Sequence, residues 1–428
     1  MILFSIYSNK TFEWEQINLS FVRTRKCAKF VVMENTQGIR VLHIASWYPS
    51  KVHDSLGNFI QRHIAAIATK HKSEVWYASP VSNESPLLGR SEVKKGDGFL
   101  ERIVYPKATK PGSVAVTRAL LKMVPGEEIS MPDLVHLHVA FPAGRAARIL
   151  AESWDVPLII TEHWTAYHDS QHIPLWRRIS MRRTAAYASA FCPVTDQLGA
   201  KMRTFKMVNI GGASNYVTVP NVVDTDRFKP SPEKGTTDEG FRILHVSSLD
   251  ESQKNITGII HALSALRTSH PDFKFSAKFM GGSDPERLTK LRHYAASMNL
   301  TEPCVSFSGP KNIDEVAQGM QMADALILFS RKENFPCVIA EAWATGVPVI
   351  STDVGGISEH LTENCGRGIL IPNEDESALR SALLRIGTEA NIDAVEIRKY
   401  AVDHFSVEAV SNAYDKVYRE ALGGDTSI

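Results

Sequence analysis

Two glutamates in the C-terminal half, Glu333 and Glu341, stand with seven residues between them in the segment Ser330-Arg-Lys-Glu-Asn-Phe-Pro-Cys-Val-Ile-Ala-Glu-Ala-Trp-Ala-Thr-Gly346. We expect a strand to end near Phe329 and a helix to begin near Pro336, because proline suits the first helical turn. Free backbone N–H groups at a helix N-terminus bind anions. Two carboxylates would repel a phosphate unless they accept hydrogen bonds from hydroxyl groups, which sugars and riboses supply. The alternative is a capping carboxylate followed by a solvated glutamate.

A glycine pair, Gly355 and Gly356, follows the apolar run 347–351, which we expect to be a strand. Glycine lets the backbone approach a ligand closely. A simple tight turn would require the same residues.

Two histidines, His136 and His138, alternate along another expected strand, 134–138. Side chains two residues apart on a strand face the same side of the sheet, so the pair could ligate a metal. No third ligand has a clear spacing, and we therefore expect His138 to line the wall of a cleft.

Apolar runs and amphipathic helical patterns alternate along most of the chain, which indicates parallel sheets with right-handed crossovers. In the first half we expect strands at 40–46, 73–79, 134–138, 158–161 and 190–194, and helices at 57–70, 143–152 and 175–187. In the second half we expect strands at 241–246, 273–280, 305–307, 325–329, 347–351 and 368–371, and helices at 256–267, 285–297, 313–322 and 337–345.

The chain therefore predicts an α/β protein with two doubly wound domains. Segment 220–240 contains three prolines, two glycines and several charges, which is typical of a linker. We expect a poorly ordered N-terminal extension (1–38), an N-terminal domain (39–220), a C-terminal domain (221–405) and a final helix (406–428) that packs back on the first domain. Ligands of such sheets bind beyond the carboxyl ends of the strands, so the domains should face each other across a cleft.

Residues 39–422 resemble the large retaining glycosyltransferase family 4, which has the GT-B fold. The resemblance rests on the glutamate segment, on Gly346-Val-Pro-Val-Ile-Ser-Thr-Asp-Val-Gly-Gly356, and on the hinge Val219-Pro-Asn-Val-Val-Asp224 followed by Phe228. It implies two facing Rossmann-like domains, the first for the acceptor and the second for the nucleotide sugar. It also implies a hexosyltransferase that moves a hexose-type sugar from a UDP-, GDP- or ADP-sugar to a glycan or lipid-linked acceptor. The implied role is polysaccharide or cell-envelope glycan synthesis, without a metal or other cofactor.

The resemblance assigns the donor site position by position. It implies that Glu333 faces the hydroxyls of the donor sugar and that Glu341 accepts hydrogen bonds from the ribose. Lys254 matches the lysine that neutralises the diphosphate, where a cation stabilises the leaving group. The remaining implied donor-site positions are Asn334, Phe335, Pro336, Gly355 and Gly356. The family usually has an arginine near Ser248, so Lys254 acts alone or with Arg331 or another basic residue.

On the first domain, Ile159-Ile-Thr-Glu-His163-Trp resembles the family's strand-end histidine, which implies that His163 lies in the cleft near the reacting carbon. A core or surface histidine is the alternative. Gly57-Asn58-Phe59 resembles the family's glycine loop near the acceptor. We therefore place Gly57, Asn58 and His138 on the acceptor side, with loops 82–98 and 167–175 shaping that site.

A front-face mechanism follows as a hypothesis, because no carboxylate nucleophile stands out on the first domain and the rule for hydrolases does not transfer simply. In this mechanism the leaving phosphate helps to deprotonate the acceptor hydroxyl.

Asp224-Thr-Asp226 matches the DxD metal motif of the other major glycosyltransferase fold. It lies in the hinge, and we expect it to be a turn. Glu359 stands where the family often has an acid, and we assign it no role.

Composition excludes several classes of protein. The formal net charge of +1 selects no nucleic-acid partner. Five cysteines without a CxxC pair favour free thiols in a reducing cytoplasm. No run of 18 apolar residues exists, so no helix should span a bilayer. Residues 1–32 lack the ordered charged, apolar and small-residue regions of a signal peptide. We prefer the interpretation that the start codon has been assigned too far upstream, since Met33 stands just before the first expected strand. A short amphipathic membrane contact is the alternative.

Four arginines cluster on the expected helix 175–187, and Trp176 and Ile179 add apolar surface: Arg177, Arg178, Arg182 and Arg183. Such a face can bind anionic lipid, and a solvated helical face is the alternative. Many members of the resembled family act on lipid-linked acceptors, so we expect peripheral contact with the inner membrane face.

Two other functions remain to be weighed. A nicotinamide-dependent oxidoreductase would share the doubly wound sheets, but no GxGxxG follows the first strand and no P-loop occurs. A sugar-nucleotide-binding protein without transferase activity, or a GT-B epimerase, stays open, and Ser248 slightly favours loss of turnover.

Overall fold

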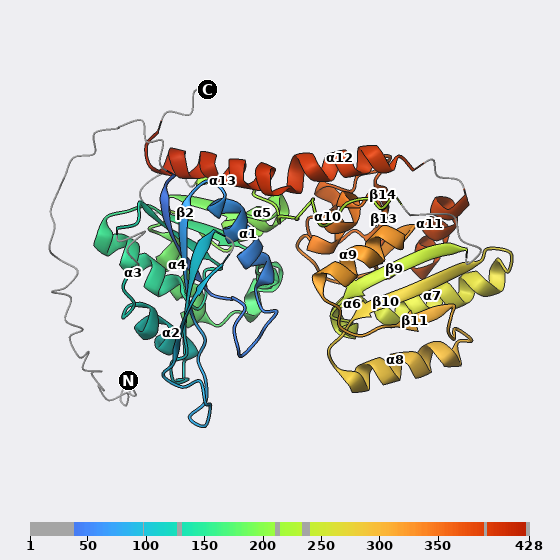
Figure 1. Cartoon of the computed structure of the whole chain (residues 1–428), viewed down its shortest axis with the longest axis horizontal. Coiled ribbons are helices and arrows are strands. Elements are labelled where there is room, and N and C mark those ends of the chain that lie inside the picture. The colour runs from blue at the N-terminus through green and yellow to red at the C-terminus, as the bar shows by residue number, and fades with distance from the viewer. Residues whose placement is uncertain are drawn as a thin grey trace, which may run out of the picture.

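The computed structural model describes residues 38–96, 98–125, 131–209, 215–232, 240–388 and 392–424. These residues form two α/β domains that lie side by side (Figure 1). Apart from Gly38, the extension expected at 1–38, including Cys27, lies outside the described residues.

The first domain is built on an eight-stranded sheet in the order β3-β4-β2-β1-β5-β6-β7-β8. All neighbouring strands are parallel except β3 and β4. The strands are β1 (Arg40–Ala45), β2 (Lys72–Ala78), β3 (Ser91–Lys95), β4 (Phe99–Val104), β5 (Leu134–His138), β6 (Leu158–Glu162), β7 (Ala190–Pro193) and β8 (Asn215–Tyr216). The strand order reverses between β1 and β5, and such a switch point is where ligands of doubly wound sheets bind.

Helices cover both faces of this sheet because each strand buries side chains on both sides. One face packs on α1 (Asn58–Ala68), as the core cluster around Val41, Ile67 and Leu134 shows. The other face packs on four further helices: α2 (Gly112–Leu120), α3 (Gly144–Trp154), α4 (Leu175–Ala185) and α5 (Asp196–Thr204). A short 3₁₀ segment, η3 (Thr165–His172), follows β6.

The hairpin β3–β4 was not expected from the sequence. The sequence predicts an acceptor loop at 82–98, but β4 pairs with β2 and β3 closes the edge of the sheet. Exposed charges such as Lys94 and Lys95 hid the strand pattern, and charges of this kind protect an edge strand from further pairing.

The second domain has a six-stranded parallel sheet in the order β11-β10-β9-β12-β13-β14. Its strands are β9 (Phe241–Ser247), β10 (Phe275–Gly281), β11 (Val305–Phe307), β12 (Ala325–Leu328), β13 (Val349–Thr352) and β14 (Gly368–Ile371). Its helices are α6 (Glu251–Lys254), α7 (Ile256–Ser269), α8 (Pro285–Ser297), α9 (Ile313–Met322), α10 (Cys337–Ala344), η4 (Ile357–Glu359), α11 (Glu376–Thr388) and α12 (Ala394–Phe405). The switch point lies between β9 and β12. The expected doubly wound α/β class is confirmed.

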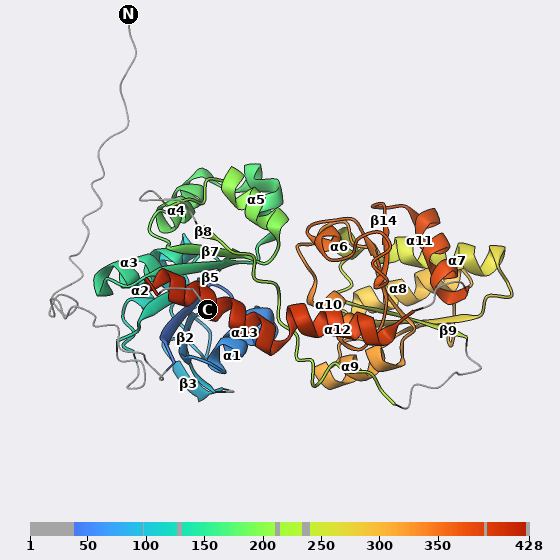
Figure 2. The same cartoon turned by 90° about the horizontal axis from the view of Figure 1, so that it is seen from above.

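The chain crosses between the domains twice. The first connection is the linker. The second runs from α12, which packs on the second domain through Ile397 and Phe405, to α13 (Val407–Ala421), which packs on the first through Tyr414 and Tyr418. Figures 1 and 2 show the two helices in line across both domains. Fully burying each such side chain contributes about 1.5–3 kcal/mol. These two chain connections contact each other, because the Val223 N–H donates a hydrogen bond to the Phe405 carbonyl at 2.7 Å.

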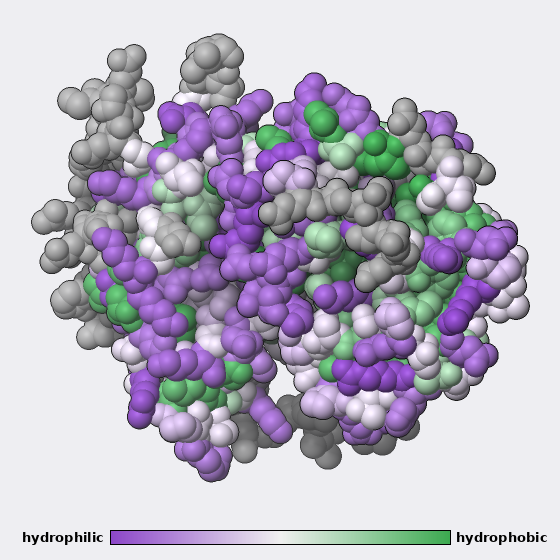
Figure 3. Space-filling view, turned by 45° about the vertical axis from the view of Figure 1, so that its right-hand side comes forward, coloured by the Kyte–Doolittle hydropathy of each residue, from purple (hydrophilic) through white to green (hydrophobic). Residues whose placement is uncertain are grey.

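The face of the molecule shown in Figure 3 is mainly polar. On this face, hydrophilic residues predominate and hydrophobic ones form small separate patches. Among the described helices, none combines the length and hydropathy that crossing a bilayer requires.

Candidate active site

Glu333 and Lys254 meet at the switch point of the second sheet. Lys254 ends α6, which follows β9, and Glu333 lies in the loop after β12. Their side chains form an ion pair, and Glu333 is only 8% exposed. Parallel strands end at one edge of a sheet, which explains why residues 79 positions apart converge there.

Glu341 is paired with the opposite domain. It lies within α10 and is 5% exposed, and its Oε1 accepts a hydrogen bond from Arg62 Nη1 of α1 at 2.6 Å. Burial lowers the pKa of Arg62, but the Glu341 carboxylate raises it. The net shift is upward, so the guanidinium stays charged. Glu341 is therefore not a solvated glutamate. No side chain caps α10, so the capping interpretation of Glu333 is wrong as well.

Asn334 joins the glutamate loop to the first domain. Its Nδ2 donates to the His163 carbonyl at 2.6 Å, and its Oδ1 lies 2.7 Å from His168 Nε2. The neighbouring Phe335 is buried against Phe405, and its carbonyl accepts from Asn221 Nδ2 of the hinge at 2.8 Å. These contacts place the loop between β12 and α10 directly beside the end of β6.

Pro336 and the glycine pair differ from expectation in detail. Pro336 has extended backbone and occupies the N-cap position without a capping hydrogen bond, so α10 begins at Cys337. Gly355 (φ +62°) and Gly356 approach protein atoms closely rather than an open ligand space. A Cβ at Gly355 would lie 2.2 Å from the Glu333 carbonyl oxygen, and one at Gly356 would lie 2.4 Å from Thr195 Cγ2. The pair therefore fits the glutamate loop to its neighbours.

Glu359, which we had left without a role, caps a helix of the other domain. Its two oxygens accept hydrogen bonds from the backbone N–H groups of Asp196 and Gln197, at 2.8 and 2.7 Å, at the start of α5. A carboxylate is favourable there because it offsets the positive end of the helix dipole. Burial raises the pKa of Glu359.

His163 lies between α1 and the glutamate loop. It is buried, its ring centroid lies 4.5 Å from that of Phe59, and it meets His63 edge-on at 5.1 Å. Burial lowers the pKa of His163 well below its usual value, so the imidazole is neutral near pH 7.

Glu162, which the sequence did not single out, holds the end of β6. Its oxygens accept from Ala140 N at 2.8 Å, from Tyr167 Oη at 2.7 Å and from His163 N at 3.2 Å. Burial raises the pKa of Glu162 to about 7. A carboxyl enclosed in this way positions the backbone around His163.

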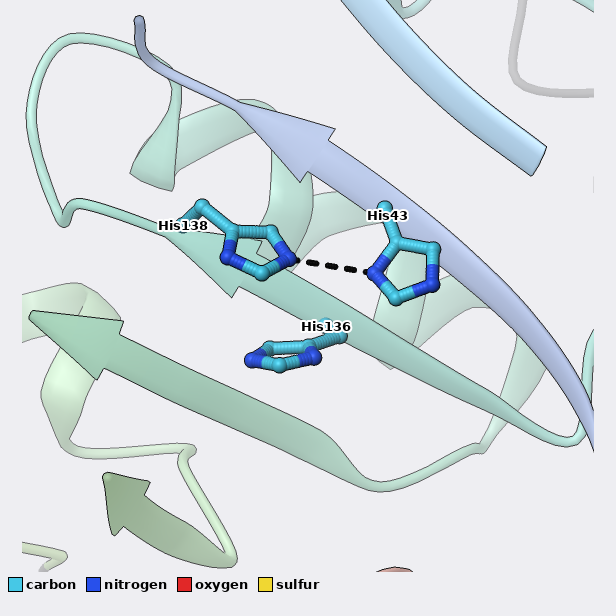
Figure 4. Close-up of side chains that lie close together, drawn as sticks. All are labelled: His43, His136 and His138. Atoms are coloured by element: carbon cyan, nitrogen blue, oxygen red, sulfur yellow. Dashed lines mark hydrogen bonds between the residues drawn. The ribbon is translucent and has the colours of Figure 1, made fainter. Parts of the chain in front are cut away.

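His138 does not line a cleft, so that expectation is wrong. It is fully buried with His43 and His136 on the face of the first sheet that α1 and α13 cover (Figure 4). His43 Nδ1 lies 3.1 Å from His138 Nε2, and His136 bonds Tyr418 Oη and Thr161 Oγ1 at 2.6 and 2.7 Å. His43 was the missing third member, because its strand places it in register with His136.

These three histidines are close enough to hold a metal ion, but their geometry is that of a hydrogen-bonded cluster. One nitrogen from each lies within 4.8 Å of the others. Both nitrogens of His136 already face hydroxyl oxygens, and its ring lies over that of His138 with centroids 4.1 Å apart. The lone pairs therefore do not converge on one point.

Gly57 and Asn58 begin α1. Gly57 has φ +73°, and a Cβ there would lie 2.6 Å from the Trp47 carbonyl, so glycine is required for the close approach. Asn58 is exposed. One turn later the same helix carries Arg62 to Glu341, which the sequence did not reveal because Arg62 lies off the Ile60-Ile64-Ile67 face.

Arg331 and the DxD-like segment take structural roles. The Arg331 guanidinium pairs with Glu374 at 2.6 Å and bonds Asn255 Oδ1 at 2.7 Å. Asp224 Oδ1 accepts from the N–H groups of Asp226 and Arg227, which confirms the expected turn. Ser248 is exposed.

The arginines of α4 lie against aromatic rings. Arg177 Cζ is 4.4 Å from the Phe141 centroid, and Arg178 and Arg182 lie 5.5 and 5.3 Å from that of Phe205. Arg183 is exposed, as are Leu175 (67%) and Trp176 (47%). Three of the four arginines therefore pack partly on aromatic rings, while the rest of this face is solvated. The described cysteines are free thiols: Cys192, Cys304, Cys337 and Cys365.

Comparison with known proteins agrees with this arrangement. Residues 240–389 match the family model for glycosyl transferases group 1, and residues 81–221 match that for a glycosyl transferase 4-like domain. Together the two models match more than half of the chain. D-inositol 3-phosphate glycosyltransferase of Corynebacterium jeikeium is 26% identical over 330 residues, covering 72% of this chain and 76% of that protein.

Two solved structures share the fold. Sucrose-phosphate synthase from Thermosynechococcus elongatus has a TM-score of 0.71 at 20% identity and covers 90% of this chain and 99% of its own. Anabaena Alr3699/HepE in complex with UDP-glucose has a TM-score of 0.67 at 16% identity and covers 89% and 100%.

The chain belongs to the group 1 glycosyltransferases, the family 4 that the glutamate and glycine segments indicated. It has the GT-B fold and is a nucleotide-sugar-dependent hexosyltransferase, as expected.

Proposed function

We propose that the protein transfers a hexose, with retention of anomeric configuration, from a nucleotide sugar to a glycan or lipid-linked acceptor. The supporting observation is the buried Glu333–Lys254 pair, which lies at a strand-end switch point directly beside the Asn334–His163 contact. In this proposal the carboxylate of Glu333 serves the sugar hydroxyls, the cation of Lys254 serves the diphosphate, and His163 contributes from the acceptor side.

Lys254 supplies positive charge to the leaving diphosphate, and Glu333 accepts hydrogen bonds from hydroxyls of the transferred sugar. Glu341 accepts from the ribose. His163 acts as a neutral hydrogen-bonding group rather than as a base, because a base with a strongly depressed pKa accepts a proton poorly near pH 7.

Retention by a front-face mechanism is part of the proposal. The acid nearest to His163 in sequence, Glu162, is fully buried and directs its oxygens to Ala140, Tyr167 and the His163 backbone. It is therefore unsuited to act as a nucleophile. Proton NMR of the product should show the anomeric configuration of the donor; an inverted product would refute the mechanism.

Because Lys254 supplies the charge, EDTA should leave the rate unchanged, and rescue by manganese would contradict a metal-independent reaction.

The donor can be identified by a thermal-shift screen against UDP-, GDP- and ADP-sugars, because a ligand that binds the native state raises the unfolding midpoint. UDP-glucose is the first candidate, since Alr3699/HepE binds it. The absence of a shift with every donor would contradict the proposal. Binding without transfer or donor hydrolysis would favour the alternative of a sugar-nucleotide-binding protein that does not transfer the sugar. The observation behind this alternative is the exposed Ser248 at the position where the family usually has an arginine.

The proposed setting is the cytoplasmic face of the inner membrane, in polysaccharide or envelope glycan synthesis. Leu175 and Ile179 are exposed next to the basic side chains of α4, and apolar residues flanked by arginines bind anionic lipid surfaces. In sedimentation with vesicles containing anionic phospholipid, the double variant Leu175→Ser/Ile179→Ser should pellet less than wild type. Equal pelleting would remove the membrane contact from the proposal.

A further inference from the structure

Five aromatic side chains on the first domain form what we call the aromatic row. Phe59, Trp47 and Trp164 adjoin His163, and Arg177 links them to the pair Phe141 and Trp176. The ring of Phe59 lies against His163, and Trp47 lies 6.5 Å from Phe59. Trp164 lies 6.4 Å from Trp47, again edge to face. The row ends at Phe141 and Trp176, whose centroids are 5.7 Å apart. Trp176 is exposed and the other four rings are half-buried: they pack on the edges of the core clusters and present their remaining surface to solvent.

The row lies where the first sheet binds ligands. Trp47, Phe141 and Trp164 follow β1, β5 and β6, which are adjacent in the sheet. The strand order reverses between β1 and β5, and the carboxyl ends at such a reversal form the usual binding crevice. These three rings pack partly against the core, and none of them takes part in the contacts of Glu333, Glu341 or Asn334 described above.

Arg177 bridges Trp164 and the pair Phe141 and Trp176. Its Cζ lies 4.4 Å from the Phe141 centroid, 5.6 Å from that of Trp176 and 5.8 Å from that of Trp164. Among the described residues no carboxylate pairs with Arg177, and its Nε is buried without a hydrogen-bond partner. Residues 171–207 contain seven lysines and arginines and one acid, so the sequence that follows η3 is strongly basic. Arg177 is thus a positioned guanidinium whose donors lack a protein anion.

We propose that this row and Arg177 form the acceptor subsite, and that the acceptor carries a phosphate. Building on the proposed function, the hydroxyl that receives the sugar lies near His163, the acceptor's sugar ring lies on Trp47 and Trp164, and its phosphate binds Arg177. Aromatic faces suit the apolar faces of sugar rings, and a guanidinium binds phosphate through two parallel hydrogen bonds. A soluble sugar phosphate and a lipid-linked sugar diphosphate share this chemistry.

Calorimetric titration of the full chain tests the subsite. Glucose 6-phosphate is compared with glucose, and a polyprenyl-diphosphate-linked sugar in detergent micelles is compared with empty micelles, each with and without UDP. We expect at least one phosphorylated probe to bind about tenfold more tightly than its unphosphorylated counterpart, which corresponds to about 1.4 kcal/mol. The arm in which this preference appears identifies the source of the phosphate. If neither arm shows it, the proposal is overturned.

Arg177→Met, which keeps the apolar stem, should lose the preference, and Arg177→Gln serves if the methionine variant does not fold. Arg148→Met is the matched control, because Arg148 lies on α3 and pairs with Glu152 away from the row. An unchanged preference in the Arg177 variants would overturn the subsite. The UDP-induced shift of the unfolding midpoint should persist in all variants; its absence from the wild type would refute the proposed function instead.

Discussion

Arg62 of the first domain and Glu341 of the second form an ion pair of 2.6 Å, although 278 residues lie between them in the chain. Both side chains are mostly buried, at 26% and 7% exposure. Removing one partner leaves a buried charge without compensation, which costs on the order of 3 kcal/mol. We expect Arg62→Ala and Glu341→Ala each to lower the free energy of unfolding by about this amount, and the double variant to lower it by much less than their sum. Urea unfolding of the four proteins measures the coupling; additive effects would contradict a direct interaction.

The two glutamates should have different kinetic roles. Glu341→Gln should raise the KM for the donor by about 10- to 100-fold with little change in kcat, because a lost hydrogen bond to a charged group is worth about 1.5–3 kcal/mol. Glu333→Gln should instead lower kcat, because in the proposed mechanism Glu333 accepts hydrogen bonds from the sugar that moves. Steady-state kinetics with saturating acceptor separates these effects, and equal, mild changes from both variants would contradict the assignment.

Glu359 should hold α5 across the domain boundary. Replacing it with glutamine removes the charge at the helix N-terminus and should cost about 1 kcal/mol. Hydrogen exchange of the amides at 196 to 204 should become faster in Glu359→Gln. Glu363→Gln is the control, because Glu363 is exposed four residues further along. Exchange equal in both variants would show that the cap contributes nothing.

The buried histidines predict sensitivity to acid. Burial lowers the pKa of His43 to about 3 and that of His63 and His71 to about 4; those of His136 and His138 are also well below 6.5. Between pH 6.5 and 4 the unfolded chain binds protons that the folded chain excludes, so stability present above pH 6.5 is lost as the pH falls. The unfolding midpoint should drop by on the order of 10 °C between pH 7.5 and pH 5. A midpoint that is equal or higher at pH 5 would contradict this prediction.

Glu162 predicts the opposite dependence. Its folded pKa, about 7, exceeds the ordinary value of 4.5, so the folded state holds the proton more tightly and the contribution of Glu162 falls as the pH rises from 4.5 to 7. Relative to wild type, Glu162→Gln should therefore gain about 3 kcal/mol of unfolding free energy between pH 4.5 and 8. Chemical denaturation at the two pH values tests the sign, and a constant difference would show that Glu162 does not titrate in this range.

The sequence predicted whatever depends on local pattern. Strand and helix periodicity predicted the doubly wound class, and the resemblance predicted that Lys254 and Glu333 belong to one site. The sequence could not reveal contacts that depend on the register between strands. His43 lies beside His136 only because their two strands pair. Domain contacts were equally hidden: Arg62, Glu359 and Gly356 have partners on the opposite domain, and no local signal marks such partners. His138 was misplaced because alternation identifies the shared side of the sheet but not whether helices cover it.

The touching crossings at Val223 and Phe405 have a mechanical consequence. Two chain connections joined at one point act as a pivot, so the domains can swing about it more readily than they can slide past each other. Contacts away from the pivot, such as the one between Glu359 and α5, then act at the end of a lever. A small rotation would break them while the bond from Val223 to Phe405 persists.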